Sequence, residues 1–231
     1  MTVTLITGGN TGLGFETARR LKALGHKVYI SSRSEEKGRQ AAAELGVEVV
    51  VMDVTDDRSV AKAAGEIQQK EGRLDVLINN AGIPGSYAAP KDMTAEMMYQ
   101  VYNTNVFGIV RVTHEFLPLL QESKQPVIVN VSSGLGSFGQ VLNPEKIESK
   151  VNSLAYCSSK AAVSMLTVQY AKGLPDIKVN AVDPGPTKTG EQFRNGVQTV
   201  TEGTDAIVKM ATITADGPTG TLTNRDGMIP W

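Results

Sequence analysis

Tyr156 and Lys160 lie one helical turn apart in an Ala-rich segment that is predicted to be a helix. Residues four positions apart on a helix share one face, so the ammonium of Lys160 can lie near the phenol of Tyr156. A tyrosine phenol has a pKa of about 10, and a nearby cation brings that pKa toward the neutral range. The pair could therefore transfer a proton, although the same spacing also occurs on ordinary amphipathic surface helices.

A glycine-rich turn near the N-terminus is the second pattern with chemical meaning. It follows the apolar run Val3–Ile6, which is typical of a buried parallel strand, and it precedes a helical stretch over residues 15–24. Gly8 permits a tight turn, Gly12 lets the backbone approach a pyrophosphate, and Gly14 lets the helix pack closely on the strand. The spacing Gly-x-x-x-Gly-x-Gly differs from the usual Rossmann fingerprint. It predicts a dinucleotide-binding turn whose helix offers N–H groups to the phosphates.

Six motifs occur in an order that resembles the short-chain dehydrogenase/reductase family, and together they extend over essentially the whole chain. The motifs are Thr7-Gly8-x-x-x-Gly12-x-Gly14, Asn79-Asn80-Ala81-Gly82, Asn105, Ser133, Tyr156-x-x-x-Lys160 and Pro184-Gly185. The resemblance implies an enzyme that transfers a hydride between a nicotinamide cofactor and a carbonyl compound or an alcohol. It also implies a Rossmann-type fold.

The resemblance assigns catalytic roles to four side chains. Ser133 would hold the oxygen of the substrate carbonyl, and Tyr156 would donate a proton to that oxygen as hydride arrives from the nicotinamide. Lys160 would lower the pKa of the tyrosine and bind the hydroxyls of the nicotinamide ribose. Asn105 would anchor a water molecule that relays protons to Lys160.

Two of these assignments have alternatives in neighbouring residues. Ser132 directly precedes Ser133 and could be the serine that faces the substrate. Asn105 could instead be a helix-bend residue that hydrogen-bonds its own backbone, and Asn103 lies close to it in the chain. The sequence leaves these alternatives open.

The end of the second predicted strand indicates which nicotinamide cofactor is used. NAD-binding proteins of this fold place an acidic residue there for the ribose hydroxyls, whereas a basic residue accommodates a 2′-phosphate. This chain has Ser31-Ser32-Arg33, so Ser32 and Arg33 offer donors to phosphate oxygens and no carboxylate repels them. The pattern predicts NADP(H), with a solvated loop arginine as the alternative for Arg33.

The resemblance places further cofactor contacts at the ends of the other strands. Asp53 and Val54 would meet the adenine, although Asp53 could also belong to a turn in which Thr55 caps the next helix. Thr187 would meet the nicotinamide carboxamide, and Thr189 would meet the diphosphate. The predicted cofactor-binding residues are Gly8, Asn10, Thr11, Gly12, Leu13, Gly14, Ser32, Arg33, Asp53, Val54, Asn80, Ala81, Gly82, Tyr156, Lys160, Pro184, Gly185, Thr187 and Thr189.

Strands that alternate with helices would bring these residues together. The predicted strands are 3–7, 27–31, 47–53, 76–79, 127–132, 178–182 and 220–223. The predicted helices are 13–24, 35–45, 57–71, 94–122, 155–173 and 203–213. This alternation predicts an α/β fold with a single Rossmann-type doubly wound parallel sheet of about seven strands and helices on both faces. At 231 residues, the chain is long enough for one such dinucleotide-binding and catalytic domain, residues 1–231.

An insertion over residues 134–153 resembles that of carbonyl-reductase-like members of the family. Three glycines among its first six residues allow the chain to turn sharply near the nicotinamide. Phe138 and Leu142 are expected to face a substrate, while the polar stretch 144–150 stays outside. The predicted walls of the substrate pocket are 82–89, 134–153 and 184–199.

The composition limits the partners and the compartment. The charges are balanced, with 23 basic and 24 acidic residues, so we expect neither nucleic acid nor an anionic membrane as a partner. The chain has no run of about 18 apolar residues and no metal-type cluster of His, Cys, Asp and Glu. The single cysteine, Cys157, excludes an internal disulfide and is typical of a reducing compartment, so the protein is predicted to be cytoplasmic.

The combined interpretation is an NADPH-dependent carbonyl reductase that acts on a small-molecule aldehyde or ketone. One alternative is an NAD(P)-dependent alcohol dehydrogenase that oxidises a specific metabolite, and another is a binding protein that senses NADP(H) without catalysis. A homodimer or homotetramer is expected, because family members commonly pair through the helices predicted at 94–122 and 155–173. Val163, Leu166 and Tyr170 are the apolar residues expected on the outer face of the second helix.

Overall fold

A computed structural model of the chain describes residues 1–189 and 196–231. Its strands are β1 (Val3–Ile6), β2 (Lys27–Ser32), β3 (Glu48–Val51), β4 (Val76–Asn79), β5 (Val127–Val131), β6 (Lys178–Val182), β7 (Leu222–Asn224) and β8 (Gly227–Met228). Its α-helices are α1 (Gly12–Ala23), α2 (Glu35–Leu45), α3 (Asp57–Glu71), α4 (Ala95–Tyr102), α5 (Gly108–Gln121), α6 (Phe138–Val141), α7 (Leu154–Gly173), α8 (Val200–Gly203) and α9 (Asp205–Ala211). Short 3-10 turns are η1 (Pro90–Asp92), η3 (Gly134–Gly136) and η4 (Ile147–Lys150), and η2 (Asn103–Phe107) is a π-helical segment. Within the described ranges, no helix is both long and apolar enough to cross a membrane.

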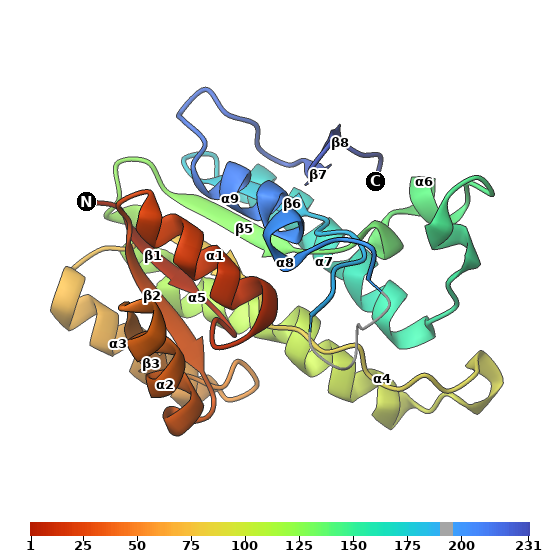
Figure 1. Cartoon of the computed structure of the whole chain (residues 1–231), viewed down its shortest axis with the longest axis horizontal. Coiled ribbons are helices and arrows are strands. Elements are labelled where there is room, and N and C mark those ends of the chain that lie inside the picture. The colour runs from red at the N-terminus through yellow and green to blue at the C-terminus, as the bar shows by residue number, and fades with distance from the viewer. Residues whose placement is uncertain (190–195) are drawn as a thin grey trace.

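The strands form one eight-stranded sheet in the order β3-β2-β1-β4-β5-β6-β7-β8. Each neighbouring pair is parallel except the last, in which β7 and β8 are antiparallel. Helices cover both faces of the sheet (Figure 1). The doubly wound parallel sheet predicted from the sequence is confirmed, and the short antiparallel β8 is an addition that the sequence pattern does not predict.

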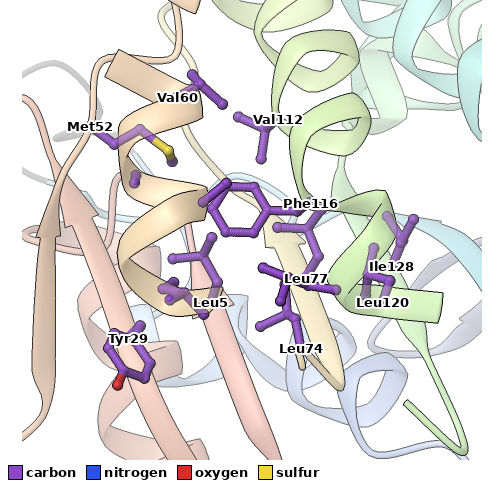
Figure 2. Close-up of a cluster of buried hydrophobic side chains, with 14 of the residues drawn as sticks. Leu5, Tyr29, Met52, Val60, Leu74, Leu77, Val112, Phe116, Leu120 and Ile128 are labelled. Atoms are coloured by element: carbon purple, nitrogen blue, oxygen red, sulfur yellow. The ribbon is translucent and has the colours of Figure 1, made fainter. Parts of the chain in front are cut away.

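Two apolar cores lie on opposite faces of the sheet, because successive residues of a strand point to opposite faces. Leu5 and Leu77 point to the face that α3 and α5 cover, and Figure 2 shows Phe116 of α5 in this core with them. Ile6 and Ile78, the next residues of the same strands, belong to the core under α1, α2 and α9. Burial on both faces explains why these strands are continuously apolar.

The helix predicted over 94–122 is confirmed as one continuous helical stretch, but the sequence pattern does not predict the π-helical segment η2 that joins α4 to α5. The side chain of Asn105 in η2 is bonded to the backbone of Ile83 and to the hydroxyl of Ser159, both far away in the sequence. The wider π turn places this amide in the interior, where it is 1% exposed. Such π segments inside helices are frequent at functional sites.

The C-terminal elements also differ from the prediction. The helix predicted over 203–213 corresponds to α9, and the separate short helix α8, which begins at a capping box of Thr199 and Glu202, precedes it and was not predicted. The last parallel strand begins at Leu222 instead of residue 220. Gly220 has a φ of 69°, which an extended strand cannot contain.

The outer apolar face predicted for the helix over 155–173 is wrong at Val163. This side chain is fully buried, and Tyr170 is partly buried against the core under α3 and α5. Leu166 is half-buried. The large apolar side chains that η2, α5 and α7 expose are Phe107, Val110, Leu154 and Met165.

Candidate active site

The carboxyl ends of β1, β4, β5 and β6 lie next to one another at one edge of the sheet, because these strands are parallel neighbours. Thr7, Asn80, Ser133 and Asp183 follow these strands within two residues. Ligands of open α/β sheets bind at this edge. The topology therefore gathers motifs that are far apart in the sequence.

Hydrogen bonds hold the glycine-rich turn against the end of β4. Thr7 Oγ1 accepts from the backbone N–H groups of Asn80 and Ala81, each at 2.9 Å. Asn80 Nδ2 donates to the carbonyl oxygens of Thr7 at 2.8 Å and Gly8 at 3.2 Å. A Cβ on Gly14 would lie 2.6 Å from both Asn80 Nδ2 and the oxygen of Gly8, so a side chain does not fit there. The turn and the Asn-Asn-Ala-Gly motif are thus one connected unit.

The N-terminus of α1 is open to an anion. Thr11 is the N-cap residue, but its side chain makes no capping bond, and the first turn contains no acidic residue. Gly12 has a φ of 56°, and the space around it is open. A Cβ placed on Gly12 would come within 4 Å of only one of the described residues, Thr189. The first N–H groups of a helix lack partners within the helix, and the macrodipole favours negative charge beside them. With Asn10 and Leu13 completing the turn, these residues fit a diphosphate.

The end of β2 presents polar groups beside this turn. Ser31 is buried, and its hydroxyl accepts from the N–H of Gly8 at 3.3 Å. Ser32 Oγ donates to the carbonyl of Ser34 at 2.8 Å and so shapes the loop into α2. Arg33 is exposed and forms no ion pair with residues 1–189 or 196–231. Its guanidinium is accessible to a ligand.

Asp53 takes part in the turn before α3. Its Oδ1 accepts from the backbone N–H and the hydroxyl of Thr55, at 2.9 and 2.7 Å. The N-cap residue of α3 is Asp56, which accepts from the N–H of Ser59 at 3.0 Å, so the alternative in which Thr55 caps this helix is wrong. Val54 is buried next to this turn.

Asn105 joins three segments of the chain. Its Oδ1 accepts from the N–H of Ile83 at 2.8 Å, and its Nδ2 donates to the carbonyl of Ile83 and to Ser159 Oγ, each at 3.0 Å. The alternative in which Asn105 bonds its own backbone is therefore wrong. Asn103 instead accepts from Arg111 through its carbonyl oxygen at 3.2 Å.

Lys160 belongs to α7, its side chain points toward β5, and it is only 5% exposed. Its Nζ donates to the carbonyl of Val131 at 2.7 Å and lies 5.6 Å from the centre of the Tyr156 ring. A Cβ on Gly82 would be 3.7 Å from this Nζ and 3.4 Å from Asn105 Oδ1. The ammonium and the amide thus face the same point at the end of β4.

Ser133, and not Ser132, is the serine near the phenol. Ser132 is 2% exposed, and its hydroxyl donates to the carbonyl of Lys160 at 3.1 Å, so it is turned into the interior. Ser133 Oγ accepts from the N–H of Leu135 at 3.2 Å, and it lies close enough to the Tyr156 phenol to lower the pKa of that phenol. The alternative that Ser132 faces the substrate is not consistent with this geometry.

The Pro184-Gly185 turn leads from β6 back toward α1. The hydroxyl of buried Thr187 donates to the carbonyl oxygens of both Pro184 and Gly185 at 3.1 Å, which fixes the turn. Thr189 then lies 3.5 Å from the position of a Cβ on Gly12, at the open end of α1. Part of the predicted wall 184–199, namely residues 190–195, lies outside the described residues.

The insertion 134–153 contains η3, α6 and η4. Phe138 and Leu142 are 68% and 76% exposed, so two large apolar side chains of this segment are accessible to a ligand. The hydroxyl of Ser137 donates to the carbonyl of Pro230 at 2.6 Å. The C-terminal segment thereby supports the beginning of the insertion.

Comparison with known proteins decides the family. The family model for short chain dehydrogenase matches residues 2–198. The chain belongs to the short-chain dehydrogenase/reductase family. A short-chain dehydrogenase of Penicillium roqueforti, anuI, is 38% identical, and the match covers 90% of this chain and 87% of that protein. A (+)-neomenthol dehydrogenase of Arabidopsis thaliana is 31% identical, with 96% of this chain and 95% of that protein covered.

A solved structure agrees with this assignment. The NADPH-bound carbonyl reductase from chicken fatty liver superposes with a TM-score of 0.86 at 26% identity, and the match covers 100% of both chains. As a member of the short-chain dehydrogenase/reductase family, this chain is an oxidoreductase.

The pKa of the Tyr156 phenol in this family member is raised, not lowered. Burial is the main cause, the carboxylate of Asp183 adds to it, and the nearby Ser133 acts in the opposite direction. Burial also lowers the pKa of Lys160 to about 8, and its ammonium is bonded to the carbonyl of Val131. The predicted lowering of the tyrosine pKa by Lys160 is therefore wrong for this structure.

Sequence reasoning missed Asp183. This side chain is 7% exposed, and its charge acts on both Tyr156 and Lys160. The sequence position of Asp183 could have indicated its role. An acidic residue between an apolar strand and the Pro184-Gly185 turn lies at the ligand-binding edge of the sheet.

Proposed function

We propose that this oxidoreductase is an NADPH-dependent carbonyl reductase that acts on small-molecule aldehydes or ketones. The observation that carries the proposal is the half-buried Tyr156 near Ser133, because desolvation raises the pKa of its phenol and so keeps the phenol protonated at neutral pH. A protonated general acid is suited to reduction, in which the carbonyl oxygen gains a proton. The full-length similarity to an NADPH-bound carbonyl reductase supports the same activity.

Four side chains have roles in the proposed reaction. Bound NADPH supplies a hydride to the carbonyl carbon. Ser133 and Tyr156 donate hydrogen bonds to the carbonyl oxygen, and Tyr156 transfers its proton as negative charge develops there. Lys160 binds the nicotinamide ribose and, with a water molecule held at Asn105, returns a proton to Tyr156. The shared orientation of Lys160 and Asn105 toward Gly82 supports this pairing.

NADP(H) is the proposed cofactor, and Arg33 is the proposed ligand of its 2′-phosphate. Arg33 is exposed beside Ser32, and Glu35, the next acidic residue in the sequence, is already paired with Arg39 at 2.5 Å. A guanidinium matches the geometry of phosphate oxygens. The other proposed contacts are Gly8, Asn10, Thr11, Gly12, Leu13 and Gly14 at the diphosphate, Asp53 and Val54 at the adenine, Asn80, Ala81 and Gly82 at the ribose, and Pro184, Gly185, Thr187 and Thr189 along the nicotinamide half.

An alcohol dehydrogenase that works in the oxidative direction is the second candidate. The reaction is reversible, and the similar Arabidopsis protein is a (+)-neomenthol dehydrogenase. Oxidation requires Tyr156 as a phenolate that can accept the alcohol proton, and both burial and Asp183 disfavour this form. We therefore place reduction first.

The proposal extends to the whole chain and its surroundings. We propose that residues 1–231 act as one dinucleotide-binding and catalytic domain, with 134–153 as a wall of the substrate pocket.

We also propose a homodimer or homotetramer, which would bury the exposed side chains of Phe107, Val110 and Met165. A light-scattering mass of one chain would contradict this oligomeric state. The single cysteine supports a cytoplasmic location, and the balanced charge supports a small-molecule substrate without nucleic acid or membrane partners.

The test is a panel of aldehydes and ketones, each incubated with the protein and either NADPH or NADH. We expect the absorbance of reduced nicotinamide to fall faster with NADPH. Alcohols with NADP⁺ run in parallel, and faster turnover in that direction at neutral pH would favour the dehydrogenase. Tight NADPH binding without turnover of any substrate would instead favour a cofactor sensor.

A further inference from the structure

The turn that follows β6 is paired with a segment later in the chain. Thr187 and Gln198 form a parallel bridge, in which the N–H of Lys188 donates to the carbonyl of Gln198 at 3.1 Å. The N–H of Gln198 donates to the carbonyl of Pro186 at 3.2 Å. These backbone bonds tie the turn, to which the proposed nicotinamide contacts belong, to the segment around Gln198.

The side chain of Gln198 packs on the same turn. Gly185 has a φ of 69°, and a Cβ placed on it would overlap the amide of Gln198. Gln198 Nε2 donates to the carbonyl of Pro184 at 3.4 Å, and Thr187 Oγ1 donates to this carbonyl at 3.1 Å. The carbonyl of Pro184 is therefore held by two side chains, one from the turn itself and one from the segment that follows it.

Gly203 of α8 lies between this turn and α1. It is buried, and a Cβ placed on it would overlap the hydroxyl of Thr187 and lie 3.0 Å from Leu13 Cδ2. Leu13 belongs to the first turn of α1, where the diphosphate is proposed to bind. A side chain larger than that of glycine would therefore push Thr187 and Leu13 apart.

Two charged side chains of α1 fix α8 in place. Arg20 Nη1 donates to the carbonyl of Thr201 at 2.8 Å and to the hydroxyl of Thr204 at 2.7 Å. Glu16 Oε1 accepts from Thr201 Oγ1 at 2.9 Å. The segment that contains Gln198 and α8 thus has one set of bonds to the turn after β6 and another set to α1.

We propose that Gln198 and Gly203 are positioning residues that hold the Pro184-Gly185 turn in place beside α1, so that both halves of NADP(H) are bound together. The choice of ligand rests on the proposed cofactor. The adenine half would bind at the glycine-rich turn and α1, whereas the nicotinamide half depends on a turn whose shape is set by another segment. Ordering such a turn in advance lowers the entropic cost of binding.

The experiment compares two ligands by titration calorimetry: NADP⁺, which has both halves, and 2′,5′-ADP, which lacks the nicotinamide half. In Gly203→Ala, the Kd of NADP⁺ should rise about tenfold, because the added methyl group displaces Thr187. In Gln198→Ala, it should rise about fivefold, because the bond to the carbonyl of Pro184 is lost. The Kd of 2′,5′-ADP should stay within about twofold in both variants. Equal changes for the two ligands, or no change for either, would overturn the proposal.

The matched control is Gly65→Ala in α3. A Cβ on Gly65 would come within 4 Å of none of the described residues outside its own helix, so neither Kd should change. Melting temperatures identify a folding defect, which would weaken the binding of both ligands together. If Gly203→Ala does not fold, Gln198→Ala decides, because it removes atoms instead of adding them, and an unchanged ratio of the two Kd values would overturn the proposal.

The cofactor itself is tested separately with the wild-type protein. A wild-type protein that binds NAD⁺ more tightly than NADP⁺ would refute the proposed cofactor. The same comparison, made with NAD⁺ and ADP, would then still judge Gln198 and Gly203, because both cofactors have the same nicotinamide half.

Discussion

The helices α1, α2 and α3 each follow a strand of the same sheet, yet their N-termini are built differently. The side chain of Ser34 caps α2, and Glu35 lies in its first turn. The side chain of Asp56 caps α3 in the same way. At α1, Thr11 makes no such bond and the first turn has no acidic residue. In α2 and α3 a side chain of the chain satisfies one terminal N–H group, whereas in α1 no side chain caps these groups and they are available to an anion.

The catalytic edge differs from this open helix end in a further way. The glycine-rich turn and the N-terminus of α1, here called the cradle, offer backbone dipoles, which do not titrate. The catalytic edge, where Ser133, Tyr156 and Lys160 meet the carboxyl ends of β5 and β6, contains Lys160 and Asp183. These two residues are 5% and 7% exposed and carry charges that depend on pH. Buried charges cost stability, but they also allow proton transfer to be adjusted. Binding of the cofactor diphosphate should therefore depend little on these groups, and chemistry should depend on them strongly.

The largest expected effect separates chemistry from binding. Tyr156→Phe removes the proton donor and leaves the cradle intact, so kcat should fall about 10³-fold while the Kd for NADPH stays nearly constant. Steady-state kinetics and a fluorescence titration measure the two quantities. Tyr99→Phe, on an exposed face of α4, is the control and should retain activity. Substantial activity in Tyr156→Phe would reject tyrosine as the acid.

The buried charge of Lys160 should be visible in the pH dependence of stability. Its pKa is about 8 in the folded protein and has an ordinary value of 10.5, so between these pH values the unfolded chain binds a proton that the folded protein does not. The free energy of unfolding should therefore rise by about 3 kcal/mol from pH 8 to 10.5, relative to Lys160→Met. Denaturant titrations of both proteins at several pH values measure this difference. Parallel curves for the two proteins would show that the burial of Lys160 does not perturb its pKa.

The cofactor preference depends on a side chain outside the backbone cradle. Arg33→Ala should weaken NADPH binding about 10- to 100-fold, because a charge-assisted bond contributes roughly 1.5–3 kcal/mol. NADH binding should change little. Arg73→Ala, which breaks an ion pair with Asp75 before β4, at the opposite end of the sheet, serves as the control in the same fluorescence titrations. Equal losses for NADPH and NADH would show that Arg33 has a structural role.

The smallest expected effect tests the open end of α1 directly. Thr11→Asp would give α1 a cap like that of α3, so the melting temperature should stay constant or rise. The added charge should weaken NADPH binding about tenfold, since it repels the diphosphate. Asp56→Ala, the reverse change at α3, should lower stability by about 1 kcal/mol without affecting NADPH binding. A Thr11→Asp protein that binds NADPH normally would place the diphosphate elsewhere.

The sequence alone determined most of the framework. The predicted bounds of α2, α3, β4 and β6 equal those observed, because local patterns set them: a capping residue and helical periodicity for the helices, and short β-branched apolar runs for the strands. Parallel topology then follows from the alternation of elements, and it brings the motifs at the strand ends to one edge of the sheet. Family membership could be predicted from these motifs as well, and it is confirmed.

Only the tertiary structure decided how the site groups interact. The π segment at Asn105 depends on a bond to Ile83, and the inward face of Val163 depends on which side of α7 packs on the sheet. The raised pKa of Tyr156 in α7 depends on burial and on Asp183, which lies in the loop after β6. These effects arise between residues that are distant in the chain. Local periodicity and spacing do not contain them, because the depth of burial and the neighbouring charges exist only after the elements have packed.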